Sequence, residues 1–144
     1  MDRKIVTLIL SLAILSSFFM PLFEWHSFEM SGLNYILSTH ISPYKYFLLL
    51  IPLSVSFLFY GTLYEENYLF SRKLLSWMPL LTLLFIFIMR YITGDSENPF
   101  SGNSNVFSSV YLGFWLTLLF SVLLVFTKGK MKPQYGESEL FFFE

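Results

Sequence analysis

Residues 106–127 read VFSSVYLGFWLTLLFSVLLVFT and carry no formal charge. A helix rises about 1.5 Å per residue, so these 22 residues are long enough to cross a bilayer core of about 30 Å. Ser109, Gly113, Thr117 and Ser121 recur at every fourth position within the stretch. In a helix they form one ridge of small residues, where the backbone of a second membrane helix can approach closely. The stretch therefore predicts a membrane helix that packs on other membrane helices.

The composition of the whole chain is also typical of a membrane protein. Of its 144 residues, 55% are hydrophobic and 13% are charged, whereas about 25% of the residues of a soluble domain are charged. The formal net charge of −1 gives no global field that would attract nucleic acid, so we expect no nucleic-acid partner. The chain has no cysteine, which excludes disulfides, thiolate metal sites and thiol catalysis.

Three further apolar runs have the length of a membrane span. They cover residues 5–23, 44–63 and 74–93. Together with residues 106–127 they predict an all-α integral membrane protein, a four-helix transmembrane bundle that forms one domain over the whole chain. The last residues, 128–144, are then a tail outside the bundle.

The basic residues predict the orientation of this bundle. Cytoplasmic flanks of membrane helices carry an excess of lysine and arginine. Only Lys45 and Arg90 fall on one side of the predicted arrangement, and the other seven basic residues fall on the opposite side. We therefore expect a multi-pass protein of the cell (inner) membrane, with both termini in the cytoplasm. The seven residues on the cytoplasmic side are Arg3, Lys4, Arg72, Lys73, Lys128, Lys130 and Lys132.

The connection at residues 24–43 would lie outside the cytoplasm and is rich in polar and aromatic residues. Ser31 is a suitable N-cap for a short helix at about residues 32–40. Such a helix would lie along the membrane surface with its apolar side toward the lipid, and aromatic residues such as Tyr35 would lie at the level of the headgroups. The residues that share its apolar face are Leu33, Ile36, Leu37 and His40.

Arg90 is a basic residue inside an apolar run, and an ionisable group in a span is a functional hypothesis by default. It has two interpretations. It can anchor the helix end by reaching the headgroups or by pairing with Asp95 or Glu97, or it can contact an ion or a ligand. Glu24 and His26, in the first outer connection, are candidate contacts for the same ion or ligand.

The chain shows no motif that predicts catalysis. It has no G-x-S-x-G sequence, no phosphate-binding glycine loop and no H-E-x-x-H or H-x-x-x-H spacing. We therefore predict no catalytic residue, no cofactor and no metal site.

The function that we expect is that of a small non-catalytic subunit or accessory factor of a membrane complex. The alternative is a small oligomeric transporter or channel for an apolar or weakly polar solute. In both cases the partners are the lipid bilayer and either a membrane protein or further copies of the chain. The ridge of small residues at 109–121 also has two interpretations, because it can pack inside the bundle or against a second subunit.

Overall fold

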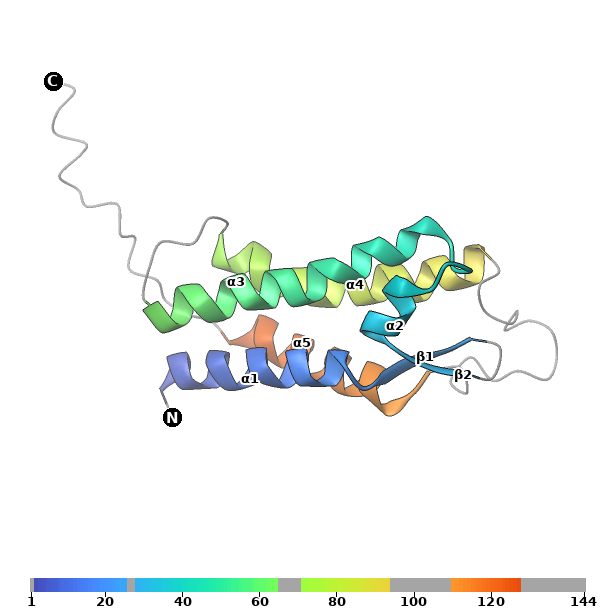
Figure 1. The fold of residues 1–144 in the computed structure, drawn as a ribbon. Coiled ribbons are helices and arrows are strands. Elements are labelled where there is room, and N and C mark those ends of the chain that lie inside the picture. The colour runs from blue at the N-terminus through green and yellow to red at the C-terminus, as the bar shows by residue number, and fades with distance from the viewer. Residues whose placement is uncertain (1, 26–27, 65–70, 94–109, 128–144) are drawn as a thin grey trace, which may run out of the picture.

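The computed structural model describes residues 2–25, 28–64, 71–93 and 110–127, and it is mostly helical (79%). Figure 1 shows its helical and extended elements along the chain. They are α1 (Arg3–Phe18), β1 (Pro21–Trp25), β2 (Phe28–Ser31), α2 (Gly32–Leu37), the 3-10 helix η1 (Pro43–Leu49), α3 (Leu50–Tyr64), α4 (Arg72–Ile92) and α5 (Leu112–Phe126).

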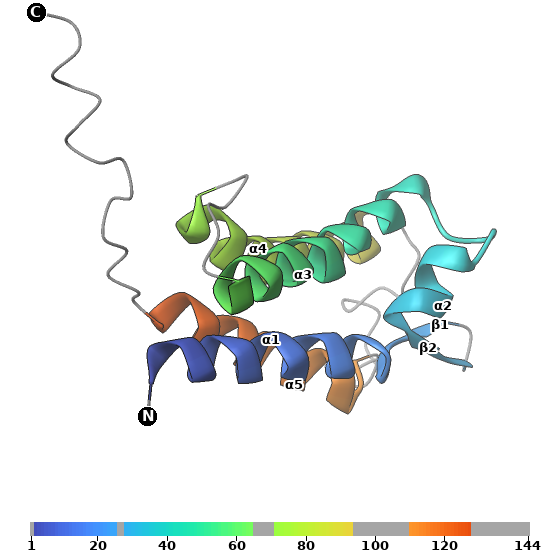
Figure 2. The same ribbon diagram turned by 60° about the vertical axis from the view of Figure 1, so that its left-hand side comes forward.

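The long helices lie side by side in two layers. α1 lies beside α5 in one layer, and α3 lies beside α4 in the other (Figure 2). Contacts of α1 with α3 and of α4 with α5 join the layers, so each of these helices packs on two of the others. Apolar side chains without any exposed surface fill the space between the layers. Among them are Ile14, Ile51, Val55, Leu58, Leu83 and Ile86.

Two helical segments of the described residues are long and apolar enough, by length and composition, to cross a membrane. They are Pro43–Tyr64, which joins η1 and α3, and Arg72–Arg90 in α4. They correspond to the spans that the sequence predicts at 44–63 and 74–93. α5 is a shorter apolar helix.

The first predicted span, residues 5–23, is longer than the helix that forms there. α1 ends at Phe18, and the next two residues close its last turn: Phe19 N–H donates to the Ser16 carbonyl at 3.2 Å, and Met20 N–H to the Ser17 carbonyl at 3.1 Å. Pro21 follows, has no N–H to continue the helix, and is the first residue of β1. Apolar residues that extend the predicted span therefore belong to a strand.

The fourth predicted span, residues 106–127, also differs from its helix, because α5 begins only at Leu112. Val110 forms a β-bridge with Phe23, and Tyr111 N–H donates to the Leu22 carbonyl at 3.1 Å. The chain before α5 is therefore extended and pairs with β1. Ser109, the first member of the predicted ridge, lies outside the described residues.

The first outer connection contains a β-hairpin that the sequence analysis does not predict. β1 and β2 are antiparallel, with Glu24 opposite Glu29. The short helix after them is confirmed as α2, which ends at Leu37, and the Ser31 side chain accepts from Asn34 N–H at 3.3 Å. Tyr35 is completely buried, so its expected place among the headgroups is wrong.

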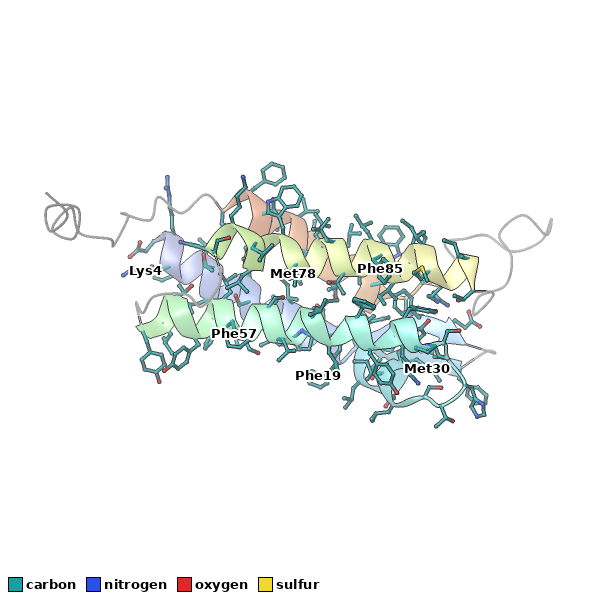
Figure 3. The ribbon with its side chains drawn as sticks, turned by 90° about the horizontal axis from the view of Figure 1, so that it is seen from above. Lys4, Phe19, Met30, Phe57, Met78 and Phe85 are labelled. Carbon is teal, nitrogen blue, oxygen red and sulfur yellow. The ribbon has the colours of Figure 1, made fainter. Side chains whose placement is uncertain are left out.

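The two ends of the molecule differ in charge. Arg3 and Lys4 begin α1, and Arg72 and Lys73 begin α4, at the same end. Figure 3 shows Lys4 at this end and Met30 of the hairpin at the opposite end. We call them the basic end and the hairpin end. The tail at 128–144 lies outside the described residues.

Candidate functional site

Arg90 lies in the last turn of α4, at the hairpin end, and none of its surface is exposed. A cation is favourable near the C-terminus of a helix, where the last carbonyl groups give a partial negative charge. Three elements besides α4 meet at this position, namely β1, α2 and the residues before α5. The predicted position of Arg90 near a helix end is therefore correct, and its side chain turns into the protein.

The guanidinium of Arg90 is held by one carbonyl and two aromatic rings. Its Nη2 donates to the backbone carbonyl of Glu24 at 2.6 Å. Its Cζ lies 4.4 Å from the ring centroid of Phe23 and 6.0 Å from that of Tyr35. A cation over an aromatic face in a desolvated place gains about 2 kcal/mol. Arg90 therefore ties the end of α4 to β1 and α2.

Two nitrogen atoms of Arg90, Nε and Nη1, have no hydrogen-bond partner among the described residues. Asp95 and Glu97, the acidic partners that the sequence suggests, lie outside those residues. A guanidinium has five N–H donors and no acceptor, so Arg90 can hold a negatively charged group or a carbonyl oxygen. In chemical terms the site is a fixed buried cation.

Glu24 reaches Arg90 through its backbone, which is a different contact from the one that its carboxylate suggests. Its partly buried side chain lies opposite Glu29 in the hairpin, and like charges in directly opposite positions destabilise a strand pair. Partial desolvation and the charges of Glu24 and Glu29 raise the pKa of Tyr111, which precedes α5, above its usual value. The rim of the hairpin end is thus acidic, above a buried cation.

His26, the third predicted contact, lies outside the described residues. In residues 2–25, 28–64, 71–93 and 110–127, no group of three or more His, Cys, Asp or Glu residues is arranged to hold a metal ion. The structure therefore brings Glu24 and Arg90 together.

The second basic residue of the hairpin end, Lys45, is also built into the protein. It is only 4% exposed, and its Nζ donates to the Ser38 carbonyl and lies 5.2 Å from the ring centroid of Tyr46. Beside it, the hydroxyl groups of Tyr35 and Tyr44 form a buried hydrogen bond of 2.6 Å. Both cations at this end therefore bind backbone carbonyls.

The aromatic part of this site is not among the contacts that the sequence predicts. Phe23 and Tyr35, with ring centroids 5.2 Å apart, are assigned by the sequence to a membrane span and to the membrane surface. The available signal is the pair of segments FEW at 23–25 and FEM at 28–30. Alternation of apolar and polar residues on both sides of a two-residue connection is typical of a hairpin.

The described members of the ridge pack inside the protein. Gly113, Thr117 and Ser121 are buried on α5, and the Thr117 hydroxyl lies 2.9 Å from the Ser17 hydroxyl of α1. A Cβ atom at Gly113 would lie 2.4 Å from the Pro21 carbonyl oxygen. This part of the ridge is therefore in contact with α1 and β1.

A double-mutant cycle tests the bond between the two hydroxyl groups. We expect Ser17→Ala and Thr117→Val to show a coupling energy of about 0.6 kcal/mol, the average for hydrogen bonds between membrane helices. The measurement is the free energy of unfolding of the four proteins in mixed micelles, titrated with SDS. Strictly additive effects would show that the two side chains do not bond each other.

The comparisons with known proteins give no relative. No family model matches the chain, and neither a curated protein nor a solved structure matches it.

Proposed function

We propose that this chain is a four-helix integral membrane protein, with both termini in the cytoplasm, that acts as a non-catalytic subunit or accessory factor of a membrane complex. The observation that carries the proposal is the distribution of side chains, which is opposite to that of a soluble protein. Large apolar residues are exposed along the outer faces of all four long helices. Examples are Ile9, Leu12, Leu53, Leu63, Leu81, Ile88, Leu119 and Leu123.

Polar side chains, in contrast, lie in the interior. The Ser11 hydroxyl has no partner among the described residues. Six of the eight buried serine and threonine hydroxyl groups in the described part of the chain lie within hydrogen-bond distance of a carbonyl oxygen three or four residues earlier in their own helix. Hydroxyl groups that bond in this way can be buried in a helix that faces lipid, because no donor remains without an acceptor. The eight residues are Thr7, Ser11, Ser17, Ser54, Thr62, Thr82, Thr117 and Ser121.

The closed interior supports an accessory role over transport. Ile14, Ile51, Leu83 and Ile86 have no exposed surface and fill the space between the two layers. A polar solute would have to displace these side chains to pass through one copy of the chain. The buried cation at the hairpin end is held by Glu24 and two aromatic rings, which is typical of a structural tie. The exposed apolar faces remain for lipid and for partner helices.

The test begins with the location. Membranes from the native host are washed with alkaline carbonate, and we expect the chain to stay in the membrane fraction. The protein, tagged at its own locus and present at its natural level, is then extracted into nanodiscs and weighed by native mass spectrometry. We expect one defined assembly in which a second membrane protein is present in a fixed ratio.

A single chain or a homo-oligomer without other proteins would overturn the accessory role. That result would favour the alternative, a small oligomeric transporter or channel for an apolar or weakly polar solute. Flux through vesicles that contain the purified oligomer, compared between the natural protein and Arg90→Met, would then be the next measurement.

A further inference from the structure

A cavity of about 540 Å³ lies at the basic end, far from the buried arginine. Residues of α1, α3, α4 and α5 line it, so it is a space between helices and not a furrow on one helix. Its volume is within the range of about 300–1,000 Å³ that is usual for small-molecule sites. Among its lining residues are Leu58, Arg72, Lys73, Ser76, Trp77 and Phe126.

The polar side of the cavity is basic, and a hydrogen bond fixes the direction of its arginine side chain. Arg72 Nη2 donates to the Thr7 hydroxyl at 2.9 Å, and Thr7, which has no exposed surface, donates to the Arg3 carbonyl at 3.0 Å. The bond from Arg72 to Thr7 uses one of the five N–H donors of the Arg72 guanidinium. Lys73 lies beside it on the exposed side. Because no Asp or Glu is among the described lining residues, this side is positive.

The other side of the cavity is apolar and continues along the outside of α4. Leu58, Leu124 and Phe126 form its wall, together with the indole of Trp77. Leu74, Trp77 and Leu81 are all exposed and follow one another at helical spacings of three and four residues. The apolar wall therefore leads from the basic residues into a strip that faces outward.

We propose that this cavity binds one anionic phospholipid. Its phosphate contacts Arg72 and Lys73, and the upper part of one acyl chain lies against Trp77 and Phe126, with the rest of the lipid along the exposed strip of α4. Basic pockets between membrane helices on the cytoplasmic side hold such headgroups. Free phosphate would use the basic residues but not the apolar wall. The proposal uses the membrane location given above and goes beyond it.

The first experiment measures how well the full-length protein retains lipid. The protein is purified in a mild detergent and mixed with phosphatidylglycerol or phosphatidylcholine of identical acyl chains, and bound lipid is counted by native mass spectrometry. We expect a clear preference for phosphatidylglycerol. The double variant Arg72→Gln/Lys73→Gln should lower the relative affinity for this lipid about 30-fold, because each basic residue near an anionic headgroup accounts for about fivefold.

The matched control is Arg3→Gln/Lys4→Gln, which removes the same charge at the same end from exposed residues that do not line the cavity. It should keep the preference. An equal loss of phosphatidylglycerol affinity in both double variants would overturn the site. Equal retention of both lipids by the natural protein would also overturn it. Lys73→Gln alone repeats the test while the bond from Arg72 to Thr7 stays in place, so a folding defect cannot explain its result.

A second experiment locates the lipid. Trp77 becomes the one tryptophan when Trp25 and Trp115 are replaced by phenylalanine, and its fluorescence is followed in vesicles with brominated phosphatidylglycerol. We expect stronger quenching than with brominated phosphatidylcholine, and inorganic phosphate should not reverse it. Equal quenching by the two lipids, or reversal by phosphate, would overturn the proposal.

A truncated chain that ends at Thr127 distinguishes the lipid from the tail as occupant. Unchanged retention of phosphatidylglycerol supports the lipid site, whereas binding that appears only after truncation would show that residues 128–144 occupy the cavity and overturn it.

An alkaline carbonate wash distinguishes failure of the lipid site from failure of the proposed membrane location. A chain that stays in the membrane without lipid preference refutes the lipid site alone, and a chain that is washed off refutes the membrane location.

Discussion

Replacement of Arg90 with alanine is expected to lower the free energy of unfolding by about 3–5 kcal/mol. The change leaves a void beside the rings of Phe23 and Tyr35, and it removes the donor that satisfies the partly buried carbonyl of Glu24. It also disconnects the end of α4 from β1 and α2. The measurement is an SDS titration in mixed micelles, followed by far-UV circular dichroism.

Methionine at the same position is the matched control. It fills most of the space of the arginine side chain and removes the two donors, Nε and Nη1, that have no partner among the described residues. Replacing a buried charge by an apolar side chain of similar volume is often neutral or stabilising. We expect Arg90→Met to be within about 1.5 kcal/mol of the natural protein. If methionine is as destabilising as alanine, the charge itself is essential, and a bound anion becomes the better explanation.

The second large effect is expected at Gly113. In the interior of an exposed helix, alanine is more favourable than glycine by about 1 kcal/mol. Here the added Cβ would lie 2.4 Å from the Pro21 carbonyl oxygen and 3.0 Å from Met20 Cβ, and the first of these contacts is with backbone. We expect Gly113→Ala to cost about 1–3 kcal/mol and Gly113→Leu to separate α5 from residues 20 and 21 so far that no folded protein is recovered.

The control for Gly113 is Leu119→Ala on the exposed side of the same helix. A change there should alter the free energy of unfolding by less than about 0.5 kcal/mol. The folded fraction is measured by size-exclusion chromatography in detergent and by thermal unfolding. Normal stability of Gly113→Leu would mean that α5 does not contact residues 20 and 21 at Gly113.

The helices could be predicted from sequence because each depends on a local property. Hydropathy over about 20 residues locates α3 and α4 within two residues of their observed starts and ends, apart from the 3-10 geometry of η1. Hydropathy does not locate the end of α1 or the start of α5, both of which lie toward the hairpin end. Leu22 and Phe23 are as apolar as any residue in a span, but their backbone pairs with residues 110 and 111. A hydropathy window contains no information about such a partner.

The candidate site was predictable only in part, for a similar reason. An arginine near the end of an apolar run is visible in the sequence. The direction of its side chain, however, depends on contacts with residues of β1 and α2. Phe23 and Tyr35 become its neighbours only when the hairpin folds. The contribution of Glu24 is a backbone carbonyl, and every residue has one, so residue type cannot indicate it. The sequence indicated Glu24 because of its carboxylate, but its backbone carbonyl makes the contact with Arg90.

The bridge between β1 and the start of α5 has a consequence for how the protein is made. Ser17 and Thr117, which bond across the α1–α5 interface, are 100 residues apart in the chain. At a translation rate of about 5–20 residues per second, the ribosome needs roughly 5–20 s to make the intervening chain. During that time the first helix and the extended segment after it lack their final neighbour. The newborn N-terminal segment therefore has to persist without this contact until the last helix is made.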